Sequence, residues 1–188
     1  MTINVNLQVD AKGLACPMPI VKTKKAIDQI EAGEVLEIEA TDRGSLADMK
    51  GWADSTGHQY IGTKEEGELL IHYIRKADPS ETKEVTAFEP EIDNDQLKEA
   101  LNDEETLVVD VREPAEYAFG HIPGAVSIPL EDLEERMKEL DVAKTINVVC
   151  RTGNRSSMAA QKLADRGFSK VQNVVPGMSQ WDGDIQSK

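Results

Sequence analysis

Two cysteines carry the reactive chemistry that this sequence offers. Cys150 stands between a run of strand-forming residues, 146–149, and the start of a predicted helix, and Arg151 and Arg155 follow it closely. A short loop wrapped around one sulfur directs several backbone N–H groups at it, and the two guanidinium groups add positive charge. Such surroundings favour the thiolate, which is the nucleophilic form of cysteine. We therefore predict a reactive sulfur that can carry a second sulfur atom, and not the small buried apolar side chain that most cysteines are.

The loop after Cys150 is expected to hold the negative charge of such an adduct. Preorganised backbone N–H groups stabilise charge without having to rearrange. Arg151 is expected to meet an incoming anionic donor, because it comes first in the loop and can point outward, whereas the forked donors of Arg155 brace the loop. The residues predicted to bind the substrate or the extra sulfur are Arg151, Thr152, Gly153, Asn154, Arg155 and Ser156.

The second cysteine, Cys16, lies directly before a helix that is predicted over residues 17–30. Proline is favoured at the first helical position, because its missing N–H would have no partner there, and Pro17 suits that position. Cys16 would then be the N-cap residue, where the helix dipole and the free N–H groups stabilise a thiolate. Since a purely structural cap is more often Ser, Thr, Asp or Asn, we predict that Cys16 is reactive as well.

The composition disfavours several classes of function. The chain of 188 residues has 35 acidic and 21 basic side chains and a net charge of -14, which opposes direct binding to nucleic acids and to anionic membranes. No segment is long enough to span a bilayer, and the first residues alternate as a strand does, unlike a secretory signal. Two cysteines do not make a disulfide scaffold, so we expect reduced thiols in the cytoplasm. Too few candidate ligands are present for a metal site, and no cofactor is expected.

Two domains are predicted, joined by a polar segment. Residues 77–84 read Ala-Asp-Pro-Ser-Glu-Thr-Lys-Glu, without apolar periodicity, and are expected to link domains at 1–76 and 85–188. Periodicity in the first domain predicts the order βαβαββ, a two-layer α/β fold with both helices on one face of the sheet. Strands alternate with helices in the second domain, which predicts a doubly wound α/β fold with a parallel sheet. Ligands bind beyond the carboxyl ends of strands in such sheets, and Cys150 lies at one of these ends.

Several short motifs in the second domain match one family. They are Asp110-Val111-Arg112-Glu113, Glu116-Tyr117, Gly120-His121-Ile122-Pro123-Gly124-Ala125, Ile128-Pro129 and the loop from Cys150 to Arg155. On the basis of these motifs, residues 85–181 resemble the rhodanese family of sulfurtransferases. The pattern departs at Pro176-Gly177, where a double glycine is usual. The resemblance implies that Cys150 carries a persulfide, taken from thiosulfate or a low-molecular-weight persulfide. We interpret Asp110 and Arg112 as a buried ion pair and His121 as part of a turn.

The first domain shows a second resemblance. The motif is Gly13-Leu14-Ala15-Cys16-Pro17-Met18-Pro19, with Asp10 upstream and Trp52, Gly57 and His58 downstream. Over about residues 5–76 the chain resembles the TusA family of sulfur carriers, which implies that Cys16 receives a persulfide and hands it to another protein. Some relatives have a second cysteine after the tryptophan. This chain has Ala53 there, so no disulfide is expected within this domain.

Together these features predict a sulfurtransferase in which sulfane sulfur passes between Cys150 and Cys16, in a direction that the sequence leaves open. Its expected partners are a small sulfane-sulfur donor and an acceptor thiol or sulfur-accepting protein. A flexible eight-residue linker would have a reach of about 15 Å. Two alternatives are a non-catalytic persulfide carrier or sensor adaptor, and a small phosphatase of related architecture. A phosphoryl group needs a wider cradle than the four residues between Cys150 and Arg155 provide, so the short loop favours a single sulfur.

Overall fold

The computed structural model describes residues 3–82 and 87–188 and divides into two compact units. The first unit spans Met1–Thr82 and the second spans Lys83–Lys188. Residues 83 and 84 of the predicted linker, 77–84, lie outside the described residues.

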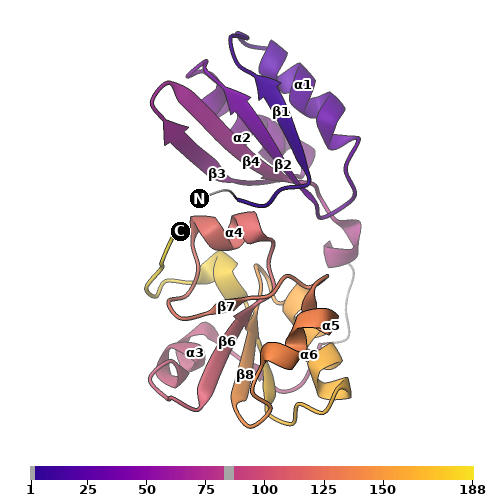
Figure 1. Ribbon diagram of the computed structural model, residues 1–188, viewed down its shortest axis with the longest axis vertical. Coiled ribbons are helices and arrows are strands. Elements are labelled where there is room, and N and C mark those ends of the chain that lie inside the picture. Colours follow the sequence, from indigo (N-terminus) through magenta and orange to yellow (C-terminus); the bar gives the residue numbers. More distant parts are fainter. Residues whose placement is uncertain (1–2, 83–86) are drawn as a thin grey trace. The chain divides into compact units, whose positions relative to one another are not determined.

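The first unit has the predicted order βαβαββ (Figure 1). Its elements are β1 (Leu7–Ala11), α1 (Met18–Ile27), β2 (Val35–Ala40), α2 (Ser45–Thr56), β3 (Gln59–Glu66) and β4 (Leu69–Arg75). The strands pair in the order β1-β2-β4-β3. The pair β1 and β2 is parallel, whereas β4 is antiparallel to both of its neighbours.

Both helices of this unit pack on one face of the sheet. Leu36 and Ile38 are fully buried and two positions apart in β2, so they point to the same face. They belong to one apolar cluster with Ile27 from α1 and Met49 from α2. The two-layer α/β fold predicted for this unit is thereby confirmed. Helix α1 is shorter at both ends than the predicted range 17–30.

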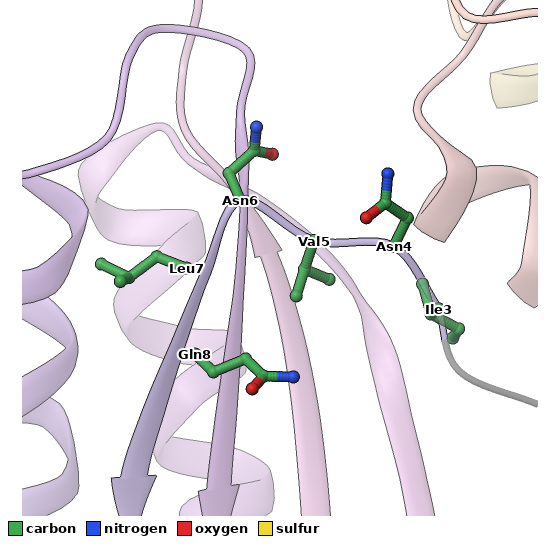
Figure 2. A pocket seen from close by; sticks show the side chains of 6 residues that line it. All are labelled: Ile3, Asn4, Val5, Asn6, Leu7 and Gln8. Carbon is green, nitrogen blue, oxygen red and sulfur yellow. The ribbon is translucent and has the colours of Figure 1, made fainter.

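Side-chain hydrogen bonds fix the entry into β1. Figure 2 shows the residues that line a hollow in the surface here, namely Ile3, Asn4, Val5, Asn6, Leu7 and Gln8. The amide of Asn6 donates to Glu34 Oε1 over 3.0 Å and accepts from the backbone N–H of Val35 over 2.9 Å. These bonds align β1 with the start of β2, and neither cysteine lines this hollow.

The segment after β4 is anchored to the first unit. A short 3-10 helix, η1, spans Pro79–Thr82. Within it, Glu81 accepts from the guanidinium of Arg75, whose side chain is 5% exposed. The backbone N–H of Ala77 donates to His58 Nδ1 over 3.0 Å. The Arg75–Glu81 ion pair and the Ala77–His58 hydrogen bond therefore hold this segment to the first unit.

The second unit builds a parallel sheet from short strands. Its elements are β5 (Glu91–Ile92), α3 (Asn94–Ala100), β6 (Thr106–Asp110), α4 (Pro114–Phe119), β7 (Val126–Ser127), α5 (Leu133–Arg136), the 3-10 helix η2 (Met137–Glu139), β8 (Thr145–Val149), α6 (Asn154–Asp165), β9 (Val171–Val174) and the 3-10 helix η3 (Gly177–Gln180). The order of strands is β5-β9-β8-β6-β7, and every pair is parallel.

Apolar clusters cover both faces of this sheet. Val148 and Val149 are neighbours in β8 and point to opposite faces. Val148 packs in a cluster with Leu163 of α6, whereas Val149 packs in another cluster with Leu97 of α3. Figure 1 shows α3 on one side of β6 and β8 and α5 and α6 on the other. The predicted doubly wound α/β fold is confirmed.

Candidate functional site

Cys150 is the first residue after the central strand β8 and lies four residues before α6. Its side chain is 1% exposed. Gly153, which precedes α6, has φ 104, a left-handed conformation that glycine adopts without strain. This turn bends the chain so that the amino-terminal end of α6 faces back toward the sulfur. Cys150 therefore lies at the carboxyl edge of the sheet, where its place in the sequence predicted a ligand site.

Two hydrogen-bond donors converge on the Cys150 sulfur. The backbone N–H of Gly153 donates to Sγ over 3.1 Å, and the hydroxyl of Ser156 donates to Sγ over 3.3 Å. Ser156 lies in the first turn of α6, so the positive end of the helix dipole adds to these bonds. Two donors and a helix amino terminus stabilise negative charge on the sulfur or on an atom attached to it.

Arg155 is held away from solvent by an acidic partner that the sequence analysis missed. Its guanidinium donates two hydrogen bonds to the carboxylate of Glu116 in α4, over 2.8 and 3.0 Å. The exposed fractions of the two side chains are 4% and 1%. The contact agrees with the bracing role expected for Arg155. Because Glu116 balances its charge, Arg155 does not supply the uncompensated positive charge that we expected beside Cys150.

The other loop residues differ in their exposure. Arg151 and Thr152 are exposed, and Asn154 is half-buried. Arg151 thus has the outward position expected of a group that meets an anionic donor. The loop itself is fixed from outside by η3, because Met178 N–H donates to the Cys150 carbonyl over 2.9 Å and Ser179 N–H donates to the Arg151 carbonyl over 2.8 Å.

Gly177 lets these two loops approach each other. A Cβ at this position would lie 2.4 Å from the Cys150 carbonyl oxygen, and Gly177 has φ 77. Only glycine satisfies both the contact and the backbone conformation. The Pro176-Gly177 pair, which departs from the usual double glycine, thus keeps the second residue at the point of contact.

Two further groups near this edge are structural. Asp110 accepts three hydrogen bonds from the side chain of Arg112, which is 8% exposed, and the predicted buried pair is confirmed. His121 hydrogen-bonds through Nδ1 with the Tyr117 carbonyl over 2.7 Å and stacks on the Tyr117 ring at a centroid distance of 3.7 Å. These contacts fix the turn at residues 120–125.

Cys16 is exposed and precedes α1. The helix begins at Met18 and Pro17 is its N-cap residue. The prediction that Cys16 is the N-cap and Pro17 the first helical residue is therefore wrong by one position. The first helical hydrogen bond runs from the Val21 N–H to the Pro17 carbonyl over 3.1 Å, which makes Pro17 the N-cap residue and leaves Pro19 at the second helical position, where a missing N–H costs no helical bond.

The charged groups around Cys16 are acidic. The carboxylate of Asp48 above all, with a smaller contribution from Asp42, raises the pKa of the Cys16 thiol above its ordinary value. The backbone N–H of Cys16 also donates to Asp42 Oδ2 over 3.1 Å. This direction is opposite to the thiolate stabilisation that we expected from the helix start. No sequence motif marks the two carboxylates, because both residues follow β2 in the chain and are distant from Cys16 in sequence.

Among the residues that the structure describes, no group of three or more His, Cys, Asp or Glu side chains is arranged to hold a metal ion. No helix in the described ranges is long and apolar enough to cross a bilayer.

Comparisons with known proteins match both units. The family model described as "Sulfurtransferase TusA" matches residues 7–76, and the model described as "Rhodanese-like domain" matches residues 93–184. The "Thiosulfate sulfurtransferase GlpE" of Pseudomonas syringae is 36% identical over 83 residues, which are 44% of this chain and 78% of that protein. A crystal structure of a rhodanese-related protein from Thermoplasma volcanium is 32% identical, with a TM-score of 0.49, and the match covers 52% of this chain and 98% of that one.

One relative matches the chain along its whole length. The "Putative sulfur carrier protein YrkF" of Bacillus subtilis is 50% identical over 185 residues, which cover 98% of this chain and 100% of that protein. The matched stretch includes both cysteine motifs of this chain. The chain therefore belongs to the family of fusion proteins in which a TusA-like sulfur-carrier domain precedes a rhodanese-like sulfurtransferase domain.

Proposed function

We propose that Cys150 takes a sulfane sulfur from thiosulfate or from a low-molecular-weight persulfide and holds it as a cysteine persulfide. The observation that carries this proposal is the pair of donors on its sulfur, Gly153 N–H and Ser156 O–H, at the start of α6. They stabilise the thiolate before the reaction and are placed beside the persulfide after it. The name of the Pseudomonas syringae relative supports thiosulfate as a donor. No cofactor takes part, since the covalent persulfide is itself the intermediate.

The loading step is a displacement at sulfur. The Cys150 thiolate attacks the outer sulfur of thiosulfate, and an S–S bond forms while the bond from that sulfur to the sulfonate group breaks. Sulfite leaves with the electron pair of the broken bond. Arg151 is exposed at the loop and meets the sulfonate, whereas Arg155 keeps the loop in shape through Glu116.

The second step is relay through Cys16. A thiolate at Cys16 attacks the outer sulfur of the Cys150 persulfide, and the new persulfide is then available to an acceptor thiol or to a sulfur-accepting protein. The exposure of Cys16 supports this role, because a partner must reach the sulfur. Both thiols are free, as such an exchange requires, which also supports the cytoplasm as its location.

Mass spectrometry of the intact chain and its peptides tests both steps. After one equivalent of thiosulfate, we expect one added sulfur atom on Cys150, and later on Cys16. Cys150→Ser should carry none at either position with thiosulfate as donor. Cys16→Ser should load normally and still convert thiosulfate and cyanide to thiocyanate. If Cys150 never gains sulfur, the proposal fails.

Mixing the two variants separates relay within one chain from relay between chains. Loaded Cys16→Ser carries sulfur only on Cys150, and Cys150→Ser offers only Cys16 as an acceptor. Sulfur that appears on the second variant has passed between chains.

The name of the full-length relative favours a carrier role as the second candidate function, and loading without steady turnover would support that role. Hydrolysis of an aryl phosphate would instead support the phosphatase.

A further inference from the structure

Two buried asparagines hold the glycines that shape the Cys150 loop. Asn173 in β9 is 1% exposed, and its side-chain amide donates to the Gly153 carbonyl over 3.3 Å. Asn94, the first residue of α3, is 7% exposed and donates to the Gly177 carbonyl over 3.1 Å. Among the described residues these are the only hydrogen bonds of the two amides. A buried amide costs free energy that few other bonds repay here, which directs attention to what each glycine does.

Gly153 is the residue whose orientation matters most to the sulfur. Its N–H donates to Cys150 Sγ over 3.1 Å, and its left-handed backbone, with φ 104, is one of several conformations open to glycine. Its carbonyl accepts the first helical bond of α6, from Ser157 N–H over 3.0 Å, as well as the bond from Asn173. Both bonds limit the rotation of Gly153 and therefore the direction of its N–H.

The bond to Gly153 comes from a fixed position in the sheet. Asn173 pairs with Val148 of β8 on one side and with Glu91 of β5 on the other. A Cβ on Gly153 would lie 3.0 Å from Val175 Cγ2, so the loop also packs closely against the residue that follows β9. The sheet, and not the loop alone, therefore determines where Gly153 lies.

The bond from Asn94 acts on the main chain of Cys150. The peptide group between Gly177 and Met178 accepts from Asn94 at its carbonyl, and at its N–H it donates to the Cys150 carbonyl over 2.9 Å. Hydrogen bonds in such a chain polarise one another. Asn94 thereby strengthens the bond that fixes the first residue of the loop.

We propose that Asn173 is a positioning residue for the Cys150 nucleophile, and that Asn94 assists it through η3. The Asn173 amide keeps the Gly153 N–H directed at the sulfur, so the negative charge of the thiolate meets a hydrogen-bond donor that is already in place. Neither asparagine takes part in the movement of protons or sulfur. This inference deepens the proposed function and rests on it, because the charge that Gly153 stabilises is that of the attacking sulfur.

Asn147 provides a matched control. It is a fully buried asparagine in the neighbouring strand β8, and neither atom of its amide has a hydrogen-bond partner in the part of the chain that the structure describes. Its partner in the ladder is Gln172, the residue before Asn173. Asn147→Ala therefore removes a buried amide of the same size without removing a hydrogen bond to the loop.

The first experiment follows the ultraviolet absorbance of the Cys150 thiolate as a function of pH. The full chain carries Cys16→Ser, which leaves Cys150 as its only thiol, and the chain that also carries Cys150→Ser gives the baseline of the tyrosines. We expect Asn173→Ala to move the titration to higher pH by roughly 0.5–1 pH units, the equivalent of one net hydrogen bond. Asn94→Ala should move it less, because Asn94 acts on the Cys150 main chain. Asn147→Ala should leave it in place.

The comparison with Asn147→Ala separates positioning from stability. Both substitutions leave a cavity, so both should lower the urea concentration at which the second unit unfolds. Only Asn173→Ala should move the titration. If Asn173→Ala titrates as the parent chain does, or if both variants move alike, the inference is overturned. Should Asn173→Ala not fold, Asn173→Leu and Asn147→Leu make the same comparison, since leucine keeps the branched shape without the amide.

The second experiment measures the rate at which thiosulfate loads Cys150 as a function of pH. The thiolate is the attacking form, so the pH–rate profile of Asn173→Ala should move to higher pH by the same amount as its absorbance titration. A rate that falls equally at every pH, with an unmoved profile, contradicts the inference. If neither the parent chain nor any variant gains sulfur, the proposed function fails, and the absorbance titration still decides whether Asn173 positions the hydrogen-bond donor at the sulfur.

Discussion

Removing Glu116 should destabilise the second unit far more than removing an exposed carboxylate. The guanidinium of Arg155 is 4% exposed, and in Glu116→Ala it loses both hydrogen bonds to Glu116 and the charge that compensates it. Breaking one partner of a buried pair costs about 3–5 kcal/mol. With a slope of about 2 kcal/mol per molar urea, the midpoint of unfolding should fall by roughly 2 M.

A matched control isolates the effect of burial. Glu134 pairs with Lys162 at 3.0 Å, and the two side chains are 56% and 43% exposed. Glu134→Ala breaks the same kind of ion pair within the same unit, and an exposed pair contributes only about 0–1 kcal/mol. Its midpoint should therefore fall by less than about 0.5 M.

Urea unfolding followed by the fluorescence of Trp181 gives this measurement. Trp181 is 8% exposed and packs in the second unit, so a Trp52→Phe background makes the signal specific to that unit. We also expect Glu116→Ala to lose most thiocyanate formation at urea concentrations where it stays folded, because Arg155 no longer braces the Cys150 loop. If Glu116→Ala and Glu134→Ala unfold at the same urea concentration, the buried pair does not stabilise the unit and the reasoning is refuted.

Two further perturbations test features of each unit. Gly177→Ala places a Cβ 2.4 Å from the Cys150 carbonyl oxygen, so it should lower both stability and sulfur loading. The control Gly124→Ala, with φ 81 and open space around its Cβ, should cost only about 1 kcal/mol of backbone strain. Equal effects of the two substitutions would exclude the close contact as the cause. Burial lowers the pKa of His72 to about 4, so the unfolded state binds a proton at a higher pH than the folded state does. The free energy of unfolding of the first unit should therefore decrease by roughly 2 kcal/mol from pH 7 to pH 5. His72→Gln should lose this part of the pH dependence in urea titrations followed by Trp52 fluorescence, and an identical dependence in both proteins would contradict it.

The periodic elements and the loop around Cys150 were predictable because their signals are local. Alternating residues such as Leu36 and Ile38 indicated a strand with one buried face, and the structure buries both completely. The apolar run before Cys150 and the glycine after it predicted a sulfur at a strand end. The two-residue strand β5 gave no such signal, because a pattern of period two cannot be recognised in Glu91 and Ile92.

The partners that determine the electrostatics of the two cysteines could not be predicted in the same way. Glu116 lies 39 positions before Arg155, and Asp42 lies 26 positions after Cys16. Each contact exists only because strands and helices bring distant parts of the chain together. The motif residues were predicted as candidates from the sequence alone, and their charges were judged without these partners. For that reason the expected stabilisation of a thiolate at Cys16 and the unpaired charge expected at Arg155 both differ from the structure.

The support that η3 gives to the Cys150 loop has a consequence for how this protein family can diversify. Main-chain N–H groups of Met178 and Ser179 hold the carbonyls of Cys150 and Arg151, so the first part of the loop is fixed by bonds that do not involve the Arg151 side chain. Arg151 and Thr152 project from the loop into solvent. Mutation at these two positions can thus alter donor preference while the geometry around the nucleophile is preserved, and a saturation library there should yield many folded proteins with changed selectivity.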